Sequence, residues 1–392
     1  VHGSIIISDM TNISITSYSA ICNLGSNINE ILKNALEGNS GCFTKDDTKI
    51  KGKSFFFGEV KTSLPEISQE DYNTRTNRLL LHCCEQIKPE LHRIIEKYGK
   101  DRIGVVIGTT DTGVEEFEKS KNIKHTEISN PAEFLHKHLE LESYYCGVST
   151  ACTSGTKAFS TAVNLLQNGV CDAVIAGSTD GLSKTPIFGF HSLEVLSFDI
   201  SNPFSKNRDG INIGEGAALF ILEKDTKDGF KILAIGETSD AYHSATPAPE
   251  GIEASRAIEQ ALEKANLKPE DIDYINMHGT GTVSNDIMEA NAIYRIFKDK
   301  TPCSTTKSLT GHCLGASAGV ETAICLAVMD KNLNPEGYLP PHVFDGQYDE
   351  QLPLIRLVKK HGTDREKHGS IKNVMCNSFG FGGSNAVIII GR

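Results

Sequence analysis

The chain lacks several features that would assign it to common functional classes. No apolar run approaches the roughly 18 residues that a membrane-spanning helix needs. No run of lysine and arginine is long enough to follow a phosphate backbone, so nucleic acid is not an expected partner. Cys-x-x-Cys and His-Glu-x-x-His spacings are absent, so we expect no metal. No cleavable apolar leader is visible, which favours a cytoplasmic protein.

Composition is otherwise that of an ordinary folded protein. Hydrophobic residues make up 39% and charged residues 23%, and 50 acidic against 39 basic residues give a formal net charge of −11. The eleven cysteines are odd in number and scattered through a long chain, so we expect reduced thiols rather than a disulfide framework. A length of 392 residues allows two domains or one large α/β body.

Apolar runs alternate with amphipathic stretches, which predicts an α/β fold rich in parallel strands. Strands are expected at 5–7, 13–17, 102–108, 172–177, 214–223, 231–238, 272–277, 371–376 and 386–390. Helices are expected at 27–37, 77–98 (with a break or new start at Pro89), 158–168, 251–265, 285–297 and 315–329. Because a similar order occurs twice, we predict two similarly built halves, 1–225 and 226–392.

The chain is organised around one cysteine. Cys152 lies in a run of small residues, Gly147 to Lys157, that leads into a predicted helix ending at Asn168-Gly169. Unpaired N–H groups and the positive end of the helix dipole would stabilise a thiolate there, so we expect a lowered pKa and a nucleophile. A buried cysteine that only fills space is the alternative.

Three further segments follow predicted strands of the second half, where ligands bind in open α/β sheets. The first is His278-Gly-Thr280-Gly-Thr282, with Asp286 after it. The second, 304–321, contains Lys307, His312 and Glu321 and lacks the Gly-Lys-Ser/Thr ending of a phosphate loop. The third, Asn377 to Asn385, places Phe379 and Phe381 among glycines that could direct N–H groups inward. Each segment alone would more often be structural.

Together, Thr150-Ala-Cys152-Thr-Ser-Gly, His278-Gly-Thr-Gly-Thr, Lys307 to Gly319 and Gly380-Phe-Gly-Gly-Ser-Asn385 resemble the elongating β-ketoacyl-acyl carrier protein synthases. The likeness also includes Asn202-Pro-Phe to Arg208-Asp-Gly and covers nearly the whole chain in the same order. It implies the thiolase fold, in which two related βαβαβ halves form a five-layered αβαβα body. It also implies a decarboxylative Claisen condensation, in fatty acid, polyene or polyketide elongation, with no cofactor.

The resemblance assigns a role to each segment. Cys152 would take the acyl group, with the N–H groups of Cys152 and Phe381 as oxyanion hole. His278 and His312 would donate hydrogen bonds to the malonyl thioester carbonyl during decarboxylation. Lys307 and Glu321 would form an ion pair behind the histidines, and Phe379 and Phe381 would belong to a gating loop. The supporting positions would be Thr280, Thr282 and Asp286.

Two departures from the family bear on the acyl group. The stretch from Gly113 to Cys152 is shorter than in fatty acid synthases of this type. Asp111 stands where the family usually places an apolar residue of the acyl pocket. We therefore expect a polar, shorter or conjugated acyl chain rather than a long saturated one.

The expected partners are an acyl carrier protein, bearing acyl and malonyl thioesters, and a second ketosynthase-like subunit, identical or inactive. An acidic carrier needs a basic patch, for which the candidates are Arg75, Arg78, Lys206 and Arg208.

Four other functions stay open. They are a non-catalytic chain-length-factor subunit, which would lack Cys152; a carrier-binding scaffold; a chain-initiating condensing enzyme, which would have asparagine in place of His312; and a thiolase, with Cys376 as its second cysteine.

Overall fold

The computed structural model describes residues 12–361, 364–365 and 367–392, so the strand expected at 5–7 lies outside the described residues. The first half contributes five strands to the main sheet, β1 (Ile13–Cys22), β4 (Ile103–Gly108), β5 (Tyr145–Val148), β6 (Ala173–Asp180) and β7 (Gly216–Lys224). They lie in the order β5-β4-β6-β7-β1. Strand β4 runs parallel to β5 and β6, and the other neighbouring pairs are antiparallel.

The second half repeats this arrangement. Its strands are β8 (Phe230–Ser239), β9 (Tyr274–Asn276), β10 (Cys303–Ser304), β13 (Asn373–Gly380) and β14 (Ser384–Gly391). Their order is β10-β9-β13-β14-β8, with β9 parallel to β10 and β13. If the five strands of each half are numbered along the chain, both halves have the order third, second, fourth, fifth and first, starting from the edge of the sheet. This shared order confirms the predicted duplication. The expectation of a parallel-rich sheet was wrong, because each half ends in two antiparallel pairings.

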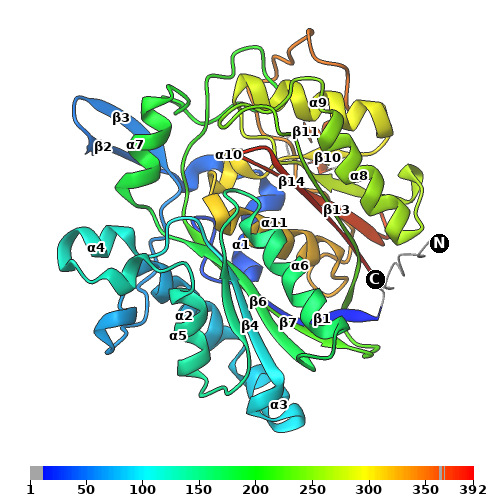
Figure 1. The fold of residues 1–392 in the computed structure, drawn as a ribbon. Coiled ribbons are helices and arrows are strands. Elements are labelled where there is room, and N and C mark those ends of the chain that lie inside the picture. The colour runs from blue at the N-terminus through cyan, green and yellow to red at the C-terminus, as the bar shows by residue number, and fades with distance from the viewer. Residues whose placement is uncertain (1–11, 362–363, 366) are drawn as a thin grey trace.

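Helices separate and cover the two halves in five layers (Figure 1). The helices are α1 (Ile28–Glu37), α2 (Arg75–Gln86), α3 (Lys88–Tyr98), α4 (Val114–Ser120), α5 (Asn130–His138), α6 (Ser154–Gln167), α7 (Lys184–Ser192), α8 (Ile252–Ala265), α9 (Val283–Phe297), α10 (Lys307–Thr310) and α11 (Ser317–Met329). In the middle layer, α6 packs on β4, β6 and β14, and α11 packs on β1, β7 and β13. Helices α2 and α5 cover the first half, and α8 covers the second.

Small residues let the two middle helices approach closely. A Cβ added to Gly155 of α6 would lie 2.9 Å from Cβ of Ala318 in α11. Every residue of α11 is buried, so this helix is apolar on all sides rather than amphipathic. Close packing of α6 on α11 sets the start of α6 beside the loop that precedes α11.

Local signals predicted the helix ends well. The Asn27 side chain accepts from two N–H groups at the start of α1, and Gly38 ends that helix with φ of 59°. Pro89 lies in the first turn of α3, as expected. Smaller elements were missed, namely β5, β10, the hairpin β2 (Thr44–Ile50) and β3 (Lys53–Phe57), and the short pair β11 (Lys360–His361) and β12 (Asp364–Arg365). No described helix has both the length and the apolar character needed to cross a bilayer.

Candidate active site

Cys152 lies in the turn between edge strand β5 and helix α6, just before the first turn of the helix. Ala151 has φ of 56°, a left-handed conformation that is uncommon for a residue with a Cβ. The Ser154 hydroxyl holds the turn, since it donates to the Ala151 carbonyl at 2.6 Å and accepts from the Thr150 N–H at 2.9 Å. The side chain of Cys152 therefore has a fixed direction, into a cavity that both halves line.

The charge of the Cys152 thiol differs from the prediction. Burial raises its pKa to about 11, although Lys307 and the backbone N–H groups of Phe381 and Cys152 act in the opposite direction. Cys152 is only 6% exposed. The sequence predicted a lowered pKa from the helix start, and this was wrong. Removing the thiolate from water costs more free energy than the helix start, Lys307 and the two N–H groups contribute in stabilising it. The resting nucleophile is a neutral thiol.

His312 contacts this thiol directly. Its Nε2 lies 3.1 Å from Sγ of Cys152, and its Nδ1 accepts a hydrogen bond from the backbone N–H of Leu314 at 3.1 Å. Because Nδ1 is an acceptor, the proton of the neutral ring resides on Nε2, and Nε2–H donates to sulfur. Burial, and then the Lys307 cation, lower the pKa of His312 well below its ordinary value. His312 is thus a neutral donor.

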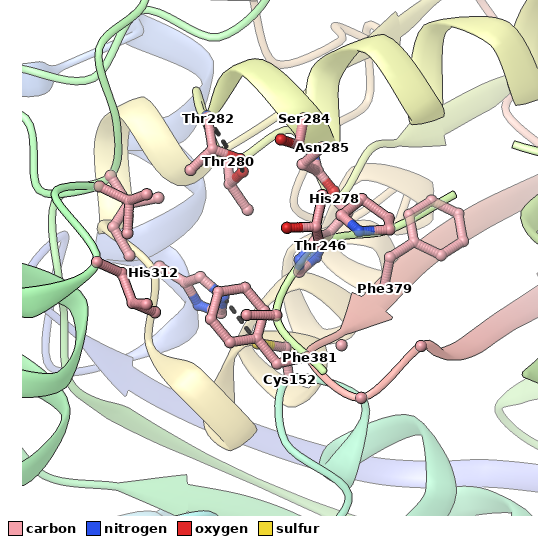
Figure 2. A pocket seen from close by; sticks show the side chains of 18 of the residues that line it. Cys152, Thr246, His278, Thr280, Thr282, Ser284, Asn285, His312, Phe379 and Phe381 are labelled. Atoms are coloured by element: carbon pink, nitrogen blue, oxygen red, sulfur yellow. Dashed lines mark hydrogen bonds between the residues drawn. The ribbon is translucent and has the colours of Figure 1, made fainter. Parts of the chain in front are cut away.

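His278 comes from the loop that follows β9. Its ring centroid lies 5.4 Å from that of His312, at an angle of 88°. Burial, then Lys307 and His312, lower the pKa of His278 well below its ordinary value. The sulfur of Cys152 and one ring nitrogen from each histidine lie within 4.8 Å of one another, so the two rings share the cavity with the thiol (Figure 2).

Lys307 and Glu321 form the predicted ion pair. The Lys307 Nζ lies 2.5 Å from Oε1 of Glu321, and both side chains are 2% exposed. The pair joins α10 to α11 in the interior, close enough to both imidazoles for its cation to oppose their protonation. Lys307 therefore acts on the site through charge and does not line the cavity.

Phe379 lies near the end of strand β13, and Phe381 lies in the glycine-rich loop between β13 and β14. Phe379 is buried, with its ring 6.0 Å from that of His278. Phe381 is 37% exposed and packs on Phe190 of α7 at 5.4 Å. The Phe381 N–H directed at Cys152 Sγ agrees with the expected oxyanion hole. Phe381 lines the cavity together with Cys152.

The cavity around these groups has a volume of about 150 Å³ and opens to solvent. Thr280 and Thr282 line it, and their hydroxyls lie 3.0 Å apart. Asp286 does not line it: this carboxylate is fully buried and accepts from the N–H groups of Phe204 and Gly281. Burial raises the pKa of Asp286 to about 6. Its role is to hold the loop after His278 against the segment that contains Phe204.

Sequence reasoning missed two carboxylates that hold the site. Glu289 on α9 accepts from the N–H groups of His278 at 2.7 Å and Gly279 at 2.6 Å. Asp180, at the end of β6, accepts from the Gly315 N–H at 2.7 Å and from the Thr110 N–H at 3.0 Å. The sequence could have indicated both. Asp180 is a charged residue at the end of an apolar strand, and Glu289 is a charged residue on the buried face of a helix.

The structure separates Asp111 from the cavity. Asp111 is buried, accepts from the Ser183 hydroxyl, and does not line the cavity at Cys152. Burial raises the pKa of its carboxyl to about 7. Its neighbour Thr110 lies near Gly315, on the loop that carries His312, so Asp111 lies behind the described cavity.

The four candidate carrier-binding residues differ in their exposure and in whether a carboxylate already pairs with them. Arg208 was a wrong choice, because its side chain is 3% exposed and pairs with Asp349 at 2.7 Å. Arg75 is held by the buried Glu215 at 2.5 Å, and Arg78 pairs with Glu66 at 2.9 Å. Lys206 is exposed.

The donor set of Cys152, His278 and His312 would suit zinc by element type and distance. A histidine that binds metal through one nitrogen normally donates the N–H of the other. Nδ1 of His312 instead accepts from a backbone N–H, which requires the proton on Nε2. The site is therefore arranged to donate hydrogen bonds to sulfur or oxygen rather than to hold a metal.

Comparison with known proteins agrees with this geometry. Residues 10–228 match the model of the β-ketoacyl synthase N-terminal domain, and residues 230–340 match that of the C-terminal domain. The chain is 30% identical to 3-oxoacyl-[acyl-carrier-protein] synthase 2 of Synechocystis sp., over 95% of this chain and 96% of the relative. It is 31% identical to nodulation protein E of Rhizobium leguminosarum bv. trifolii, over 95% of this chain and 97% of the relative.

Solved structures show the same fold. The ketosynthase ApeO, determined in complex with its chain length factor ApeC from Xenorhabdus doucetiae, superposes with a TM-score of 0.90 at 35% identity, over 97% of this chain and 98% of that chain. A β-ketoacyl synthase from Burkholderia phymatum, at 24% identity, has a TM-score of 0.85 over 98% of this chain and all of that one. Both domain models, the near full-length relatives and the thiolase-type fold show that this chain belongs to the β-ketoacyl synthase family of acyltransferases.

Proposed function

We propose that Cys152 accepts an acyl group from an acyl carrier protein and that the chain condenses it with malonyl-acyl carrier protein. The product would be a β-ketoacyl thioester two carbons longer. One observation carries the proposal: Nε2–H of His312 donates to the Cys152 sulfur at 3.1 Å, within a cluster that brings His278 within 4.8 Å.

Loading is a thiol–thioester exchange. The bond from the Cys152 sulfur to the acyl carbonyl carbon forms and the carrier's C–S bond breaks. The departing carrier thiolate takes up the proton that Cys152 loses, so no external base is consumed. Because burial disfavours the thiolate, the His312 hydrogen bond and the N–H groups of Cys152 and Phe381 supply the stabilisation that this step requires.

Condensation follows in the same cavity. The malonyl thioester carbonyl would accept from both imidazoles while the C–C bond to the carboxylate breaks and carbon dioxide leaves. The resulting enolate carbon attacks the acyl-cysteine, whose oxygen turns to the N–H groups of Cys152 and Phe381. Collapse of that intermediate releases the Cys152 thiolate, which takes up a proton from solvent and returns to the neutral thiol that His312 contacts. Neutral imidazoles suit this task, because an imidazolium would transfer its proton and quench the enolate.

We further propose that the acyl chain extends towards Asp111 and is polar, short or conjugated. The support is a buried carboxyl that shares a hydrogen bond with Ser183, next to Thr110 at the loop of His312. Replacing Asp111 with Leu should shift the preference towards saturated chains of about twelve carbons or more. Best elongation of such chains by the unaltered protein would refute the proposal.

For assembly, we propose a dimer with a second ketosynthase-like subunit through the edge strand β5, in the cytoplasm. The 35% identical ApeO was solved with a chain length factor, which favours an inactive homologue as the partner. All eleven cysteines lie in the described residues and are free thiols there.

The thiolase alternative is disfavoured, because Cys376 is fully buried in β13 and does not line the cavity. A chain-length-factor role is disfavoured by the intact nucleophile turn.

The test is intact-mass analysis after incubation with a panel of acyl-carrier thioesters. We expect a mass gain in the wild type and none in Cys152→Ala. His278→Ala should load but fail to decarboxylate malonyl-carrier, since His278 acts on the extender. Equal labelling of Cys152→Ala would refute the nucleophile, and loss of loading in His278→Ala would refute the division of roles.

A further inference from the structure

Ser317, the first residue of helix α11, lies beside the imidazole of His312. Its Oγ is 2.9 Å from Nδ1 of that ring, closer than the backbone nitrogen of Leu314 at 3.1 Å. Ser317 is 3% exposed and does not line the cavity at Cys152. Its hydroxyl can therefore reach the reacting atoms only through His312.

The direction of the hydrogen bond between Ser317 and His312 follows from the Leu314 N–H. A backbone N–H only donates, so Nδ1 of His312 accepts from it and carries no proton. A hydroxyl beside an unprotonated nitrogen donates its own proton to that nitrogen. Among the described residues, the Ser317 hydroxyl has no other hydrogen-bond partner, so its proton is directed at Nδ1. Nδ1 thus accepts two hydrogen bonds.

Strand β6 of the first half holds the turn that leads to Ser317. The Asp180 carboxylate accepts from the Gly315 N–H at 2.7 Å, and the Ser178 hydroxyl donates to the Ala316 carbonyl at 3.3 Å. Gly315 and Ala316 directly precede Ser317 in the chain, so these contacts fix the position of its backbone. The serine is therefore held at the ring by contacts that do not involve the cavity.

We propose that Ser317 is a positioning residue for the reaction and that it strengthens the hydrogen bond donated by His312. The inference rests on the proposed condensation and adds a residue to its machinery. Hydrogen bonds in a chain polarise one another, so donation to Nδ1 makes the Nε2–H of the same ring a stronger donor. That N–H faces the Cys152 sulfur at 3.1 Å and would face the malonyl thioester carbonyl during decarboxylation.

The first test is a double-mutant cycle measured by alkylation of Cys152. Ser317→Ala should slow iodoacetamide labelling at pH 8 about two- to fivefold, which is the lower part of the range that one neutral hydrogen bond contributes. The same substitution in His312→Ala should have no effect, because the ring that transmits it is gone. The matched control is Ser255→Ala, which removes a buried hydroxyl that donates to the Gly251 carbonyl in the first turn of α8. It should change the rate in neither background.

The second test is carbon dioxide release from malonyl-carrier. Ser317→Ala should lower kcat about two- to fivefold and leave KM unchanged, because the serine does not touch the bound substrate. An unchanged kcat would overturn the proposal.

The alkylation cycle has two further outcomes that would overturn the proposal. Equal slowing by Ser317→Ala in both backgrounds would mean that the serine does not act through His312. An unchanged or faster reaction in the wild-type background would mean that Ser317 only packs the turn, since loosening the turn would expose the thiol. A wild type that neither loads an acyl group nor releases carbon dioxide would instead refute the proposed function, and alkylation would still decide the role of Ser317.

Discussion

The reactivity of Cys152 towards an alkylating agent gives the sharpest test of the site's electrostatics. With a pKa of about 11, only about one molecule in a thousand carries the thiolate at pH 8, against about a quarter for a cysteine with the ordinary value. Alkylation of Cys152 at pH 8 should therefore be roughly 200-fold slower than that of an ordinary exposed thiol. Its rate should rise about tenfold per pH unit up to pH 10.

Removing the His312 donor should slow the reaction further. A hydrogen bond to a charged group contributes about 1.5–3 kcal/mol, which corresponds to about one to two pKa units. His312→Ala should thus react about 10- to 100-fold more slowly at pH 8. No direct hydrogen bond joins His278 to the sulfur in the described structure, so His278→Ala serves as the control and should change the rate less than about threefold.

The assay is timed iodoacetamide labelling followed by peptide mass analysis. Cys42 and Cys146 are partly exposed and react in parallel, so Cys152→Ala supplies the background. A Cys152 rate that reaches its plateau by pH 8 or 9 would refute the reasoning. It would mean that the start of α6 lowers the thiol pKa, as the sequence suggested, and that burial does not dominate.

Other predictions concern groups behind the site. In Lys307→Met with Glu321→Gln, loss of the cation should raise the pKa of both histidines. Carbon dioxide release measures the rate of malonyl decarboxylation. As the pH is lowered, this rate should begin to fall at a higher pH in the double variant than in the wild type, whose rate should stay level down to pH 6.5. Identical pH profiles for the two proteins would contradict this. Glu289→Ala leaves two buried N–H groups without an acceptor, at about 1–3 kcal/mol each, and should lower Tm by several degrees in calorimetry. Arg208→Ala breaks the ion pair between the buried Arg208 and the partly exposed Asp349 and should lower the free energy of unfolding measured with denaturant; a stability equal to wild type would contradict this.

Local patterns along the chain were sufficient to predict the helix ends and to identify the reacting groups. Helix ends were readable because Asn27, Gly38 and Pro89 act on their own neighbours in the chain. Cys152 and His312 were readable because few residue types carry out nucleophilic or hydrogen-bond-donor chemistry, and their surroundings of small residues are distinctive.

The charge states of these groups, and whether their side chains are buried or paired, depend on the folded structure. The pKa of Cys152 depends on how completely packing removes it from water, which no local pattern records. The tautomer of His312 depends on the direction of the Leu314 N–H. Arg208 reads as a surface cation until the fold places Asp349, 141 residues later, beside it. The burial of Cys152 and the pairing of Arg208 arise from segments that are distant in sequence, whereas the His312 tautomer depends on the folded geometry of its own turn.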